Sequence, residues 1–436
     1  MEKPKKNKDT MSILIYGFII FGLLGRLIPL GSINAFRFFH VWCALIVAYS
    51  FFRKTERATL QFIAIAMPLM LYLCICNLLF EININNSIFN SDHMLKLILL
   101  ISLFISTVVM AAKLKKESID EKFNIVVLYL KIFIVTAIIG MMFFVGYYLK
   151  IIPVNFISQF QVQLQFGAGG LLRVSPGSYP NEYGTVASFA MSIFTLLLFN
   201  KDQLKNENTI FTNKKNNFLF IASWILTLVV LFLATTRSAY ASFAIALIYI
   251  IFTNKKVNSL IKSILKITFL FIVICIFVQA FVYDINSHFI KIYNSTFENG
   301  GNSSIQKRYE KWDDASEYIS ENLFFGIGYG KNSTTHNVYL QLPSEIGVVG
   351  IVILIITFIL LGCSEMMKTE KIFLPPTVKY ELLLKVKNIA IIHVLWFATN
   401  NHNLNHHLTW FCILLILSLR YKIVNQEYVS RKKQEV

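Results

Sequence analysis

Residues 303–350 read SSIQKRYEKWDDASEYISENLFFGIGYGKNSTTHNVYLQLPSEIGVVG, a long polar segment in a chain built mostly of apolar runs. Apolar residues recur in its first half at helical spacing, and Ser303 or Ser304 can cap the helix. We therefore predict an amphipathic helix outside the membrane, followed by a segment that enters the membrane after His336. The predicted apolar face comprises Ile305, Tyr309, Trp312, Ala315, Ile319 and Leu323, and the acidic face comprises Glu310, Asp314, Glu317 and Glu321.

The composition is that of a membrane protein. Of the 436 residues, 56% are hydrophobic and 15% are charged, and the mean hydropathy is +0.59; soluble domains average about 25% charged residues. The formal net charge of +17 raises the question of nucleic acid. Lys and Arg lie mostly in short loops between apolar runs, however, so we predict topology-setting cations and no nucleic-acid binding.

The apolar runs predict an all-α, polytopic transmembrane helical bundle of about 12 spans, because a bilayer core needs about 20 apolar residues per helix. Irregular backbone cannot face lipid, so each run is expected to be helical. The runs are 11–30, 34–52, 58–80, 94–112, 123–149, 182–200, 217–235, 238–253, 263–283, 337–362, 387–400 and 407–420.

Alternate loops carry most of the Lys and Arg, which the positive-inside rule assigns to the cytoplasm. An even number of spans then puts both termini in the cytoplasm. No small-x-small cleavage site follows the basic N-terminus, so its apolar run is predicted to be a retained span and not a cleaved signal peptide. We treat 1–436 as a single integral membrane domain. The substantial loops on the outer (periplasmic) face are 151–181 and 284–335, and the second is partly helical.

Three arginines fall on the predicted outer face. Arg308 lies within the apolar arc of the helix, where it needs an anionic partner, a phospholipid headgroup or a protein carboxylate. Arg237, in the turn ATTRSAY, is either an interfacial anchor or a ligand for a diphosphate, which suits the planar fork of arginine. Arg173, in LLRVSPGSYPNEYG, either lines a polar cleft or is an ordinary solvated residue. Asn181 follows it, just before the sixth run.

Two groups of histidines stand out. His336, next to Asn337, lies at the membrane entrance and can orient or deprotonate a sugar hydroxyl, although a lone histidine is more often structural. In NNHNLNHH, His402 and His406 have a spacing that suits a metal if the segment is helical. No outer carboxylate or cysteine completes that site, so a polar cap is the preferred interpretation. We predict no metal and no cofactor.

The segment from Arg308 to Gly350 resembles the O-antigen ligase and O-antigen polymerase superfamily. His336-Asn337, nine residues, then Gly347 and Gly350 are similar to its HN-x9-G-x-x-G pattern. The stretch Arg308-Tyr309-x-x-Trp312 and the sequence FGIGYG resemble the region ahead of its histidine. ATTRSAY resembles its arginine between two central spans, and SYPNEYG its Pro-Asn element.

The resemblance implies a metal-independent glycosyltransferase at the outer face of the bacterial cytoplasmic (inner) membrane. Its donor is a glycan on undecaprenyl diphosphate, and its catalytic residues are His336, Arg308 and Arg237, with the two arginines holding the diphosphate. The implied partners are this donor, a glycan or lipid A-core acceptor, the lipid bilayer and a chain-length regulator. Glu345 is a candidate for pairing with an arginine. The substrate-binding candidates are Arg173, Asn181, Asn337, Trp312 and Glu345.

Three functions stay open at this point. A polymerase passes the glycan to the next lipid-linked repeat unit and builds O-antigen, capsule or exopolysaccharide, whereas a ligase passes it to the lipid A-core of lipopolysaccharide. We favour the polymerase, because a Phe-, Ile-, Asn- and Lys-rich chain is associated with surface-polysaccharide polymerases. A lipid-linked oligosaccharide transporter would show internal symmetry and broken helices at mid-membrane. Lys131, in the middle of the fifth run, fits the enzyme interpretation least well.

Overall fold

The computed structural model describes most of the chain. The described residues are 10–27, 38–52, 57–85, 91–161, 164–166, 172–205, 214–253, 290, 303–332, 335–363, 377–400, 404 and 406–419. They are 85% helical and contain no β-strand. The helices are α1 (Thr10–Leu24), η1 (Gly25–Leu27), α2 (Phe38–Phe52), α3 (Arg57–Asn85), α4 (Ser91–Lys116), α5 (Ile119–Tyr148), α6 (Val154–Gln159), α7 (Pro180–Phe199), α8 (Lys201–Lys205), α9 (Lys214–Leu233), α10 (Arg237–Thr253), α13 (Ser303–Glu321), α14 (Val338–Cys363), α15 (Val378–Asn400) and α16 (His407–Ser418).

The helices are those of a multi-pass membrane protein. Seven described helices are long and apolar enough to cross a membrane, namely α3, α4, α5, α7, α9, α14 and α15. Four shorter apolar helices, α1, α2, α10 and α16, accompany them. The predicted run 263–283 lies outside the described residues, and each of the other runs coincides with one of these helices. The all-α membrane fold is therefore confirmed, and the total of about 12 spans stays a prediction.

One predicted boundary is wrong. The sequence predicts the eleventh run at 387–400, whereas α15 begins at Val378. Lys379, Glu381 and Lys385 interrupt the apolar pattern, but Lys and Glu are good helix formers and continue the helix beyond its most apolar part. The ammonium of Lys379 also lies 2.6 Å from a carboxylate oxygen of Asp120, so this end of α15 is tied to the start of α5.

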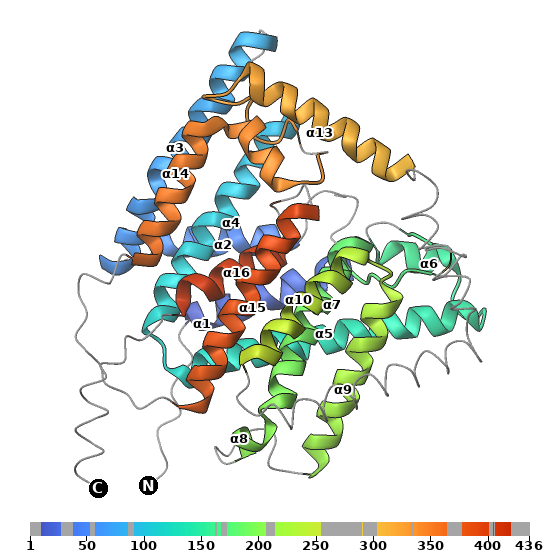
Figure 1. Ribbon diagram of the computed structural model, residues 1–436. Coiled ribbons are helices and arrows are strands. Elements are labelled where there is room, and N and C mark those ends of the chain that lie inside the picture. Colours follow the sequence, from blue (N-terminus) through green and yellow to red (C-terminus); the bar gives the residue numbers. More distant parts are fainter. Residues whose placement is uncertain are drawn as a thin grey trace, which may run out of the picture.

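Helix α7 lies in the core of the bundle, packed against α9, α10 and α15 (Figure 1). Nearly all of its residues are buried. Small hydroxyl side chains let the backbones approach, as is common between helices in membranes. The Oγ of Ser188 lies 2.7 Å from the Oγ of Ser242 in α10, and the Oγ of Ser192 lies 3.2 Å from Nε2 of His393 in α15.

Several loops that are distant in sequence meet at one end of the bundle, below α13 (Figure 1). We call it the α13 end. Asn77, near the end of α3, and Lys96, in the second turn of α4, hydrogen-bond residues of the loop that follows α13. Arg173 contacts the turn between α9 and α10, and Glu182 in α7 contacts His406 at the start of α16. The residues in these contacts belong to loops, or to the helix ends next to them, that the sequence predicts on the outer side of the membrane.

Candidate active site

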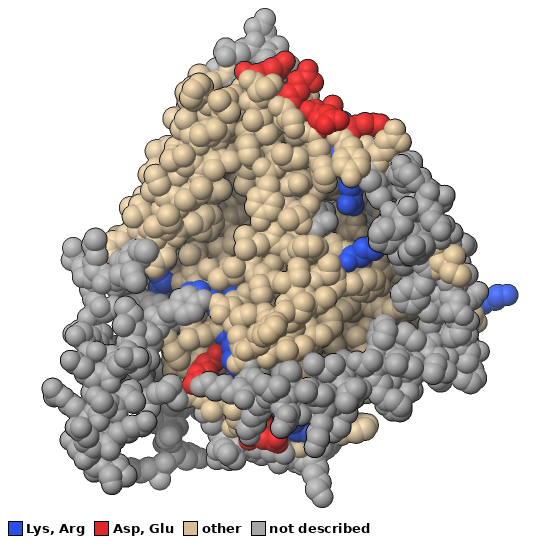
Figure 2. All heavy atoms as spheres, viewed as in Figure 1, with Lys and Arg blue, Asp and Glu red and all other residues tan. Residues whose placement is uncertain are grey.

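Helix α13 presents opposite faces to solvent and to the bundle. Glu310, Glu317 and Glu321 are exposed, and Figure 2 shows a row of acidic atoms along the edge of α13 that faces away from the bundle. On the other face Ala315 is fully buried. The indole Nε1 of Trp312 donates a hydrogen bond of 3.0 Å to the carbonyl oxygen of Thr335. The helix is thereby fixed to the residue immediately before His336.

Two arginines are brought together beneath this helix. Arg308 is half-buried, one turn before Trp312, and Arg237 is the exposed first residue of α10. Burial, and secondly the positive charge of Arg237, lower the pKa of Arg308 below its usual range. Such an influence requires the two guanidinium groups to lie near each other. Among the described residues, no carboxylate pairs with Arg308.

Arg173 is half-buried, and its donors are bound by neighbouring loops and helix ends. Its Nε donates to the Ala234 carbonyl oxygen at 3.0 Å, and its guanidinium binds Gln165, Asn181 and Thr236 at 2.7, 2.8 and 2.9 Å. All four acceptors are neutral, and burial lowers the pKa of Arg173 to about 10. Arg173 therefore ties the loop before α7 to the turn that carries Arg237, and the amide oxygen of Asn181 is one of the acceptors in that tie.

His336 lies between two fixed residues. Its φ of 54° is in the left-handed region, which is uncommon for a residue with a side chain. Thr335 before it is held by Trp312. Asn337 after it caps α14, because its Oδ1 accepts the backbone N–H of Tyr339 at 2.9 Å. Asn337 thus sets where α14 begins. Together with Thr335 it fixes the backbone on both sides of His336, and so the direction of the His336 side chain.

The first half of α14 is separated from the second by a break at Gly347, where φ is 62° and ψ is −179°. The chain that leaves α13 fills this break. The N–H groups of Ile327 and Gly328 donate to the carbonyls of Ser344 and Glu345, and the N–H of Val348 donates to the carbonyl of Leu323 at 2.9 Å. Leu323 therefore belongs to this insertion and not to the apolar face of α13, which ends at Glu321.

Each of the two glycines of the HN-x9-G-x-x-G pattern lies where a side chain would collide with a different neighbour. A Cβ at Gly347 would lie 2.3 Å from the Phe324 carbonyl oxygen. A Cβ at Gly350 would lie 2.6 Å from the ring of Tyr72 in α3. The hydroxyl of Tyr72 donates to the Ile346 carbonyl at 2.6 Å. Tyr72 thus binds the backbone of α14 directly next to the break.

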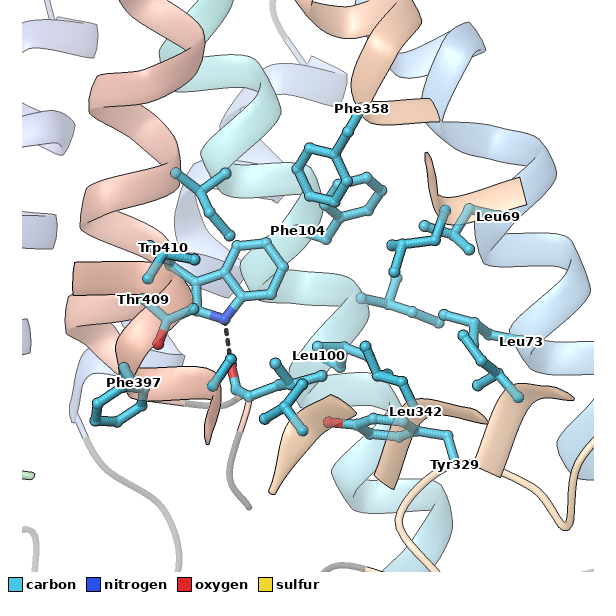
Figure 3. Close-up of a pocket in the computed structure, with 18 of the residues that line it drawn as sticks. Leu69, Leu73, Leu100, Phe104, Tyr329, Leu342, Phe358, Phe397, Thr409 and Trp410 are labelled. Carbon is cyan, nitrogen blue, oxygen red and sulfur yellow. Dashed lines mark hydrogen bonds between the residues drawn. The ribbon is translucent and has the colours of Figure 1, made fainter. Parts of the chain in front are cut away.

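A cavity of about 330 Å³ extends from this region into the bundle between α3, α4, α14, α15 and α16. Its lining is almost entirely apolar. Figure 3 shows Tyr329 and Leu342 at one end and Phe104 and Phe358 at the other. Val338 and Tyr339, the residues directly after His336-Asn337, belong to the lining. The cavity therefore adjoins the motif, and its polarity suits a hydrocarbon chain.

Residues 222–355 match the model of the O-antigen ligase family. The predicted resemblance to the O-antigen ligase and O-antigen polymerase superfamily is thereby confirmed. The matched segment runs from α9 into α14 and contains Arg237, Arg308, His336, Gly347 and Gly350. Arg173 and Asn181 lie outside it. The search of curated proteins gave no match to the chain.

The structure brings some of the predicted site residues together and gives others separate partners. Arg237 and Arg308 share one electrostatic environment, and Trp312 connects α13 with the residue before His336. Glu345 contacts Gln341 and the backbone of Asn332, and no arginine among the described residues. Sequence reasoning missed Tyr72, Asn77 and Lys96, since nothing in their local pattern distinguishes them from other polar residues near a helix end.

The histidine-rich segment forms no metal site in the described part of the chain. His402 lies outside the described residues. His406 is fully buried, with its Nε2 3.5 Å from a carboxylate oxygen of Glu182, and its ring stacks on Phe397 at 5.3 Å. Lys131, the cation in the fifth run, lies exposed on the surface of α5, where a long side chain can extend toward the headgroups.

Proposed function

We propose that this protein transfers a glycan from a polyprenyl diphosphate, undecaprenyl diphosphate in bacteria, to an acceptor hydroxyl at the outer face of the cytoplasmic membrane. Both termini then lie in the cytoplasm, and the α13 end faces outward. The match of residues 222–355 to the O-antigen ligase family supports a glycan-processing enzyme of the ligase or polymerase type. The finer choice of donor, acceptor and membrane face is our proposal.

The observation that carries the proposal is the environment of Arg308, which is half-buried and lies within the electrostatic influence of Arg237. Burial and the neighbouring positive charge both disfavour the charged form of Arg308. An anion bound at Arg308 would offset this cost. A diphosphate carries several acceptor oxygens and matches two planar guanidinium forks. Arg173 adds a third positive charge to the same region, with its donors already used on neutral acceptors.

The chemistry follows from this placement. The acceptor oxygen forms a bond to the anomeric carbon, and the bond between that carbon and the diphosphate oxygen breaks. The diphosphate leaves with the bonding electrons, and the arginines stabilise its growing negative charge. The acceptor hydroxyl loses its proton to His336, which is held at the membrane entrance. Because the two arginines supply the positive charge, we propose that no metal is required.

The apolar cavity provides for the hydrocarbon part of the lipid. It adjoins His336-Asn337 through Val338 and Tyr339 and extends inward toward Phe358. A polyprenyl chain placed there has its diphosphate near the α13 end. The polyprenyl chain comes from the bilayer, whose acyl tails are as apolar as the cavity, so it gains packing contacts there and no transfer out of water. The cavity therefore contributes shape and the arginines contribute orientation.

We propose polymerisation of lipid-linked repeat units as the first candidate and ligation to lipid A-core as the second. The description of the matched family favours the second. The transporter alternative would use a broken span to bind its substrate. The one broken span among the described residues, α14, has its break filled by Leu323–Gly328 of the same chain, which bind the carbonyls of Ser344 and Glu345 and the N–H groups of Val348 and Val349. These backbone groups are therefore used within the protein.

The test uses purified full-length protein in proteoliposomes with a defined undecaprenyl-diphosphate oligosaccharide, with and without lipid A-core, and with EDTA throughout. Glycan products are resolved by length. A ladder formed without lipid A-core supports the polymerase. Product formed only when lipid A-core is supplied supports the ligase.

Matched variants locate the site. We expect Arg237→Gln and Arg308→Gln to lower kcat about 100-fold or more, as loss of a transition-state donor does, and His336→Ala to abolish most turnover. Lys131→Gln, on the exposed side of α5, is the control and is expected to retain activity. Transfer that persists in both arginine variants, or that stops on addition of EDTA, contradicts the proposal.

A further inference from the structure

Glu345 is a fully buried carboxylate whose partners come from the loop before His336. Its Oε1 accepts the backbone N–H of Asn332 at 2.9 Å. The Nε2 of Gln341 lies 3.1 Å from each carboxylate oxygen. The side chain is therefore committed to the protein itself.

The arrangement is specific for a group that accepts hydrogen bonds without donating. One backbone N–H group and one side-chain amide point at the carboxylate, and a buried donor left without an acceptor is costly. A glutamine in this place would direct its own NH2 group at one of these donors. A carboxylate is thus retained in an apolar region because it satisfies both donors at once.

Hydrogen bonds continue from this carboxylate to His336. The Nδ2 of Asn332 donates to Ser344 at 2.9 Å, and the Oγ1 of Thr335 donates to the Asn332 carbonyl at 2.7 Å. The carbonyl of Thr335 in turn accepts from Trp312. A shift of Asn332 therefore moves Thr335 and the left-handed backbone of His336, which persists only because its surroundings hold it.

A second contact fixes the same loop from α3. The amide of Asn77 donates to the Tyr329 carbonyl at 3.3 Å and accepts the Tyr329 N–H through its Oδ1. The Nζ of Lys96 donates to the Gly330 carbonyl at 3.2 Å. Asn77 and Lys96 thus hold residues 329–330, and Glu345 separately holds Asn332 two residues later.

We propose that Glu345 is a positioning residue for glycan transfer, whose carboxylate holds Asn332 so that His336 is directed at the acceptor hydroxyl. The expected effect on turnover rests on the proposed function, whereas the contact between Glu345 and the loop does not. The arginines that hold the donor diphosphate are on other elements, α10 and α13. Glu345 therefore affects turnover and leaves donor binding intact.

The experiment compares wild type, Glu345→Gln and Glu345→Asp in proteoliposomes. We expect Glu345→Gln to lower kcat about 100-fold, because a displacement of order 1 Å at a reacting group has that effect, with KM for the lipid-linked donor changed less than about threefold. Glu345→Asp keeps a group that only accepts, and is expected to recover part of kcat. The control is Glu182→Gln, which alters another buried carboxylate at the α13 end, bound to Ser178 at 2.9 Å. We expect it to lower Tm but keep kcat.

A readout independent of turnover is hydrogen exchange in the peptide that covers residues 327–336. We expect this peptide to exchange faster in Glu345→Gln than in wild type, and at the wild-type rate in Glu182→Gln. Unchanged exchange and unchanged kcat in Glu345→Gln overturn the inference, as does a Glu182→Gln variant with an equal loss of kcat. If exchange rises as expected but the wild type transfers no glycan, the loop contact stands and the proposed function fails.

Discussion

The indole Nε1 of Trp312 donates a hydrogen bond of 3.0 Å to the carbonyl oxygen of Thr335, and this contact connects the helix that carries Arg308 to the residue before His336. Arg308 lies one helical turn away from Trp312. This single contact therefore connects Arg308, the proposed diphosphate-binding group, with His336, the proposed base. The two residues lie on different elements, α13 and the segment just before α14.

Replacing Trp312 with Phe tests this connection. The ring remains, but the Thr335 carbonyl loses its partner, so we expect the free energy of unfolding to fall by about 1 kcal/mol and kcat to fall severalfold. Tyr318→Phe, on the same helix with an exposed side chain, is the control. Thermal unfolding in detergent and the transfer assay provide the measurements. Equal behaviour of the two variants contradicts the prediction.

Three glycines of α14 are expected to differ sharply when changed to Ala. Gly347→Ala combines a positive φ with a close approach to backbone, so it should prevent the break from forming. Gly350→Ala forces Tyr72 to move and should cost about 1–3 kcal/mol. Gly362 has open space around its Cβ position, and its substitution should be neutral. Expression level and Tm of the three variants measure how strongly each is destabilised. A Gly347→Ala variant with wild-type expression and Tm would contradict this explanation of the break.

Arg173 is expected to act through geometry and not through charge alone. Lys cannot reproduce four bonds to separate acceptors, so Arg173→Lys should lose activity nearly as fully as Arg173→Ala. A double-mutant cycle of Arg173→Ala with Thr236→Ala should show coupling of about 1 kcal/mol, because the two side chains lie in contact at 2.9 Å. Full activity of Arg173→Lys would instead indicate that its charge contacts the substrate.

The pH dependence of Arg308→Lys follows from the local environment. Burial and the neighbouring Arg237 disfavour the charged form at this position, yet an arginine stays protonated in the wild type. A lysine starts from an ordinary pKa of about 10.4, and the same two causes lower it. The variant should therefore lose its charge at a lower pH than an ordinary lysine, and its activity relative to wild type should fall as pH rises toward about 10.4. A parallel pH profile for the two proteins would contradict this.

The sequence by itself determined the class of fold and the outline of the site. Long apolar runs must be helical in a bilayer because every backbone polar group needs an internal partner, and α3, α4, α5 and α14 lie where such runs occur. The polar segment at 303–350 is a helix followed by a membrane entrance, as its spacing indicates. These features depend on local pattern, which is fully present in the sequence.

The tertiary structure alone decided which polar residues contact one another. Arg173 and Asn181 bind each other, Glu345 binds the backbone of Asn332, and Arg237 lies near Arg308. From α3, far earlier in the chain, Tyr72 contacts α14 and Asn77 contacts the loop after α13. The physical reason is that periodicity specifies the face of a helix, whereas the partner of a hydrogen bond depends on how helices distant in sequence pack together.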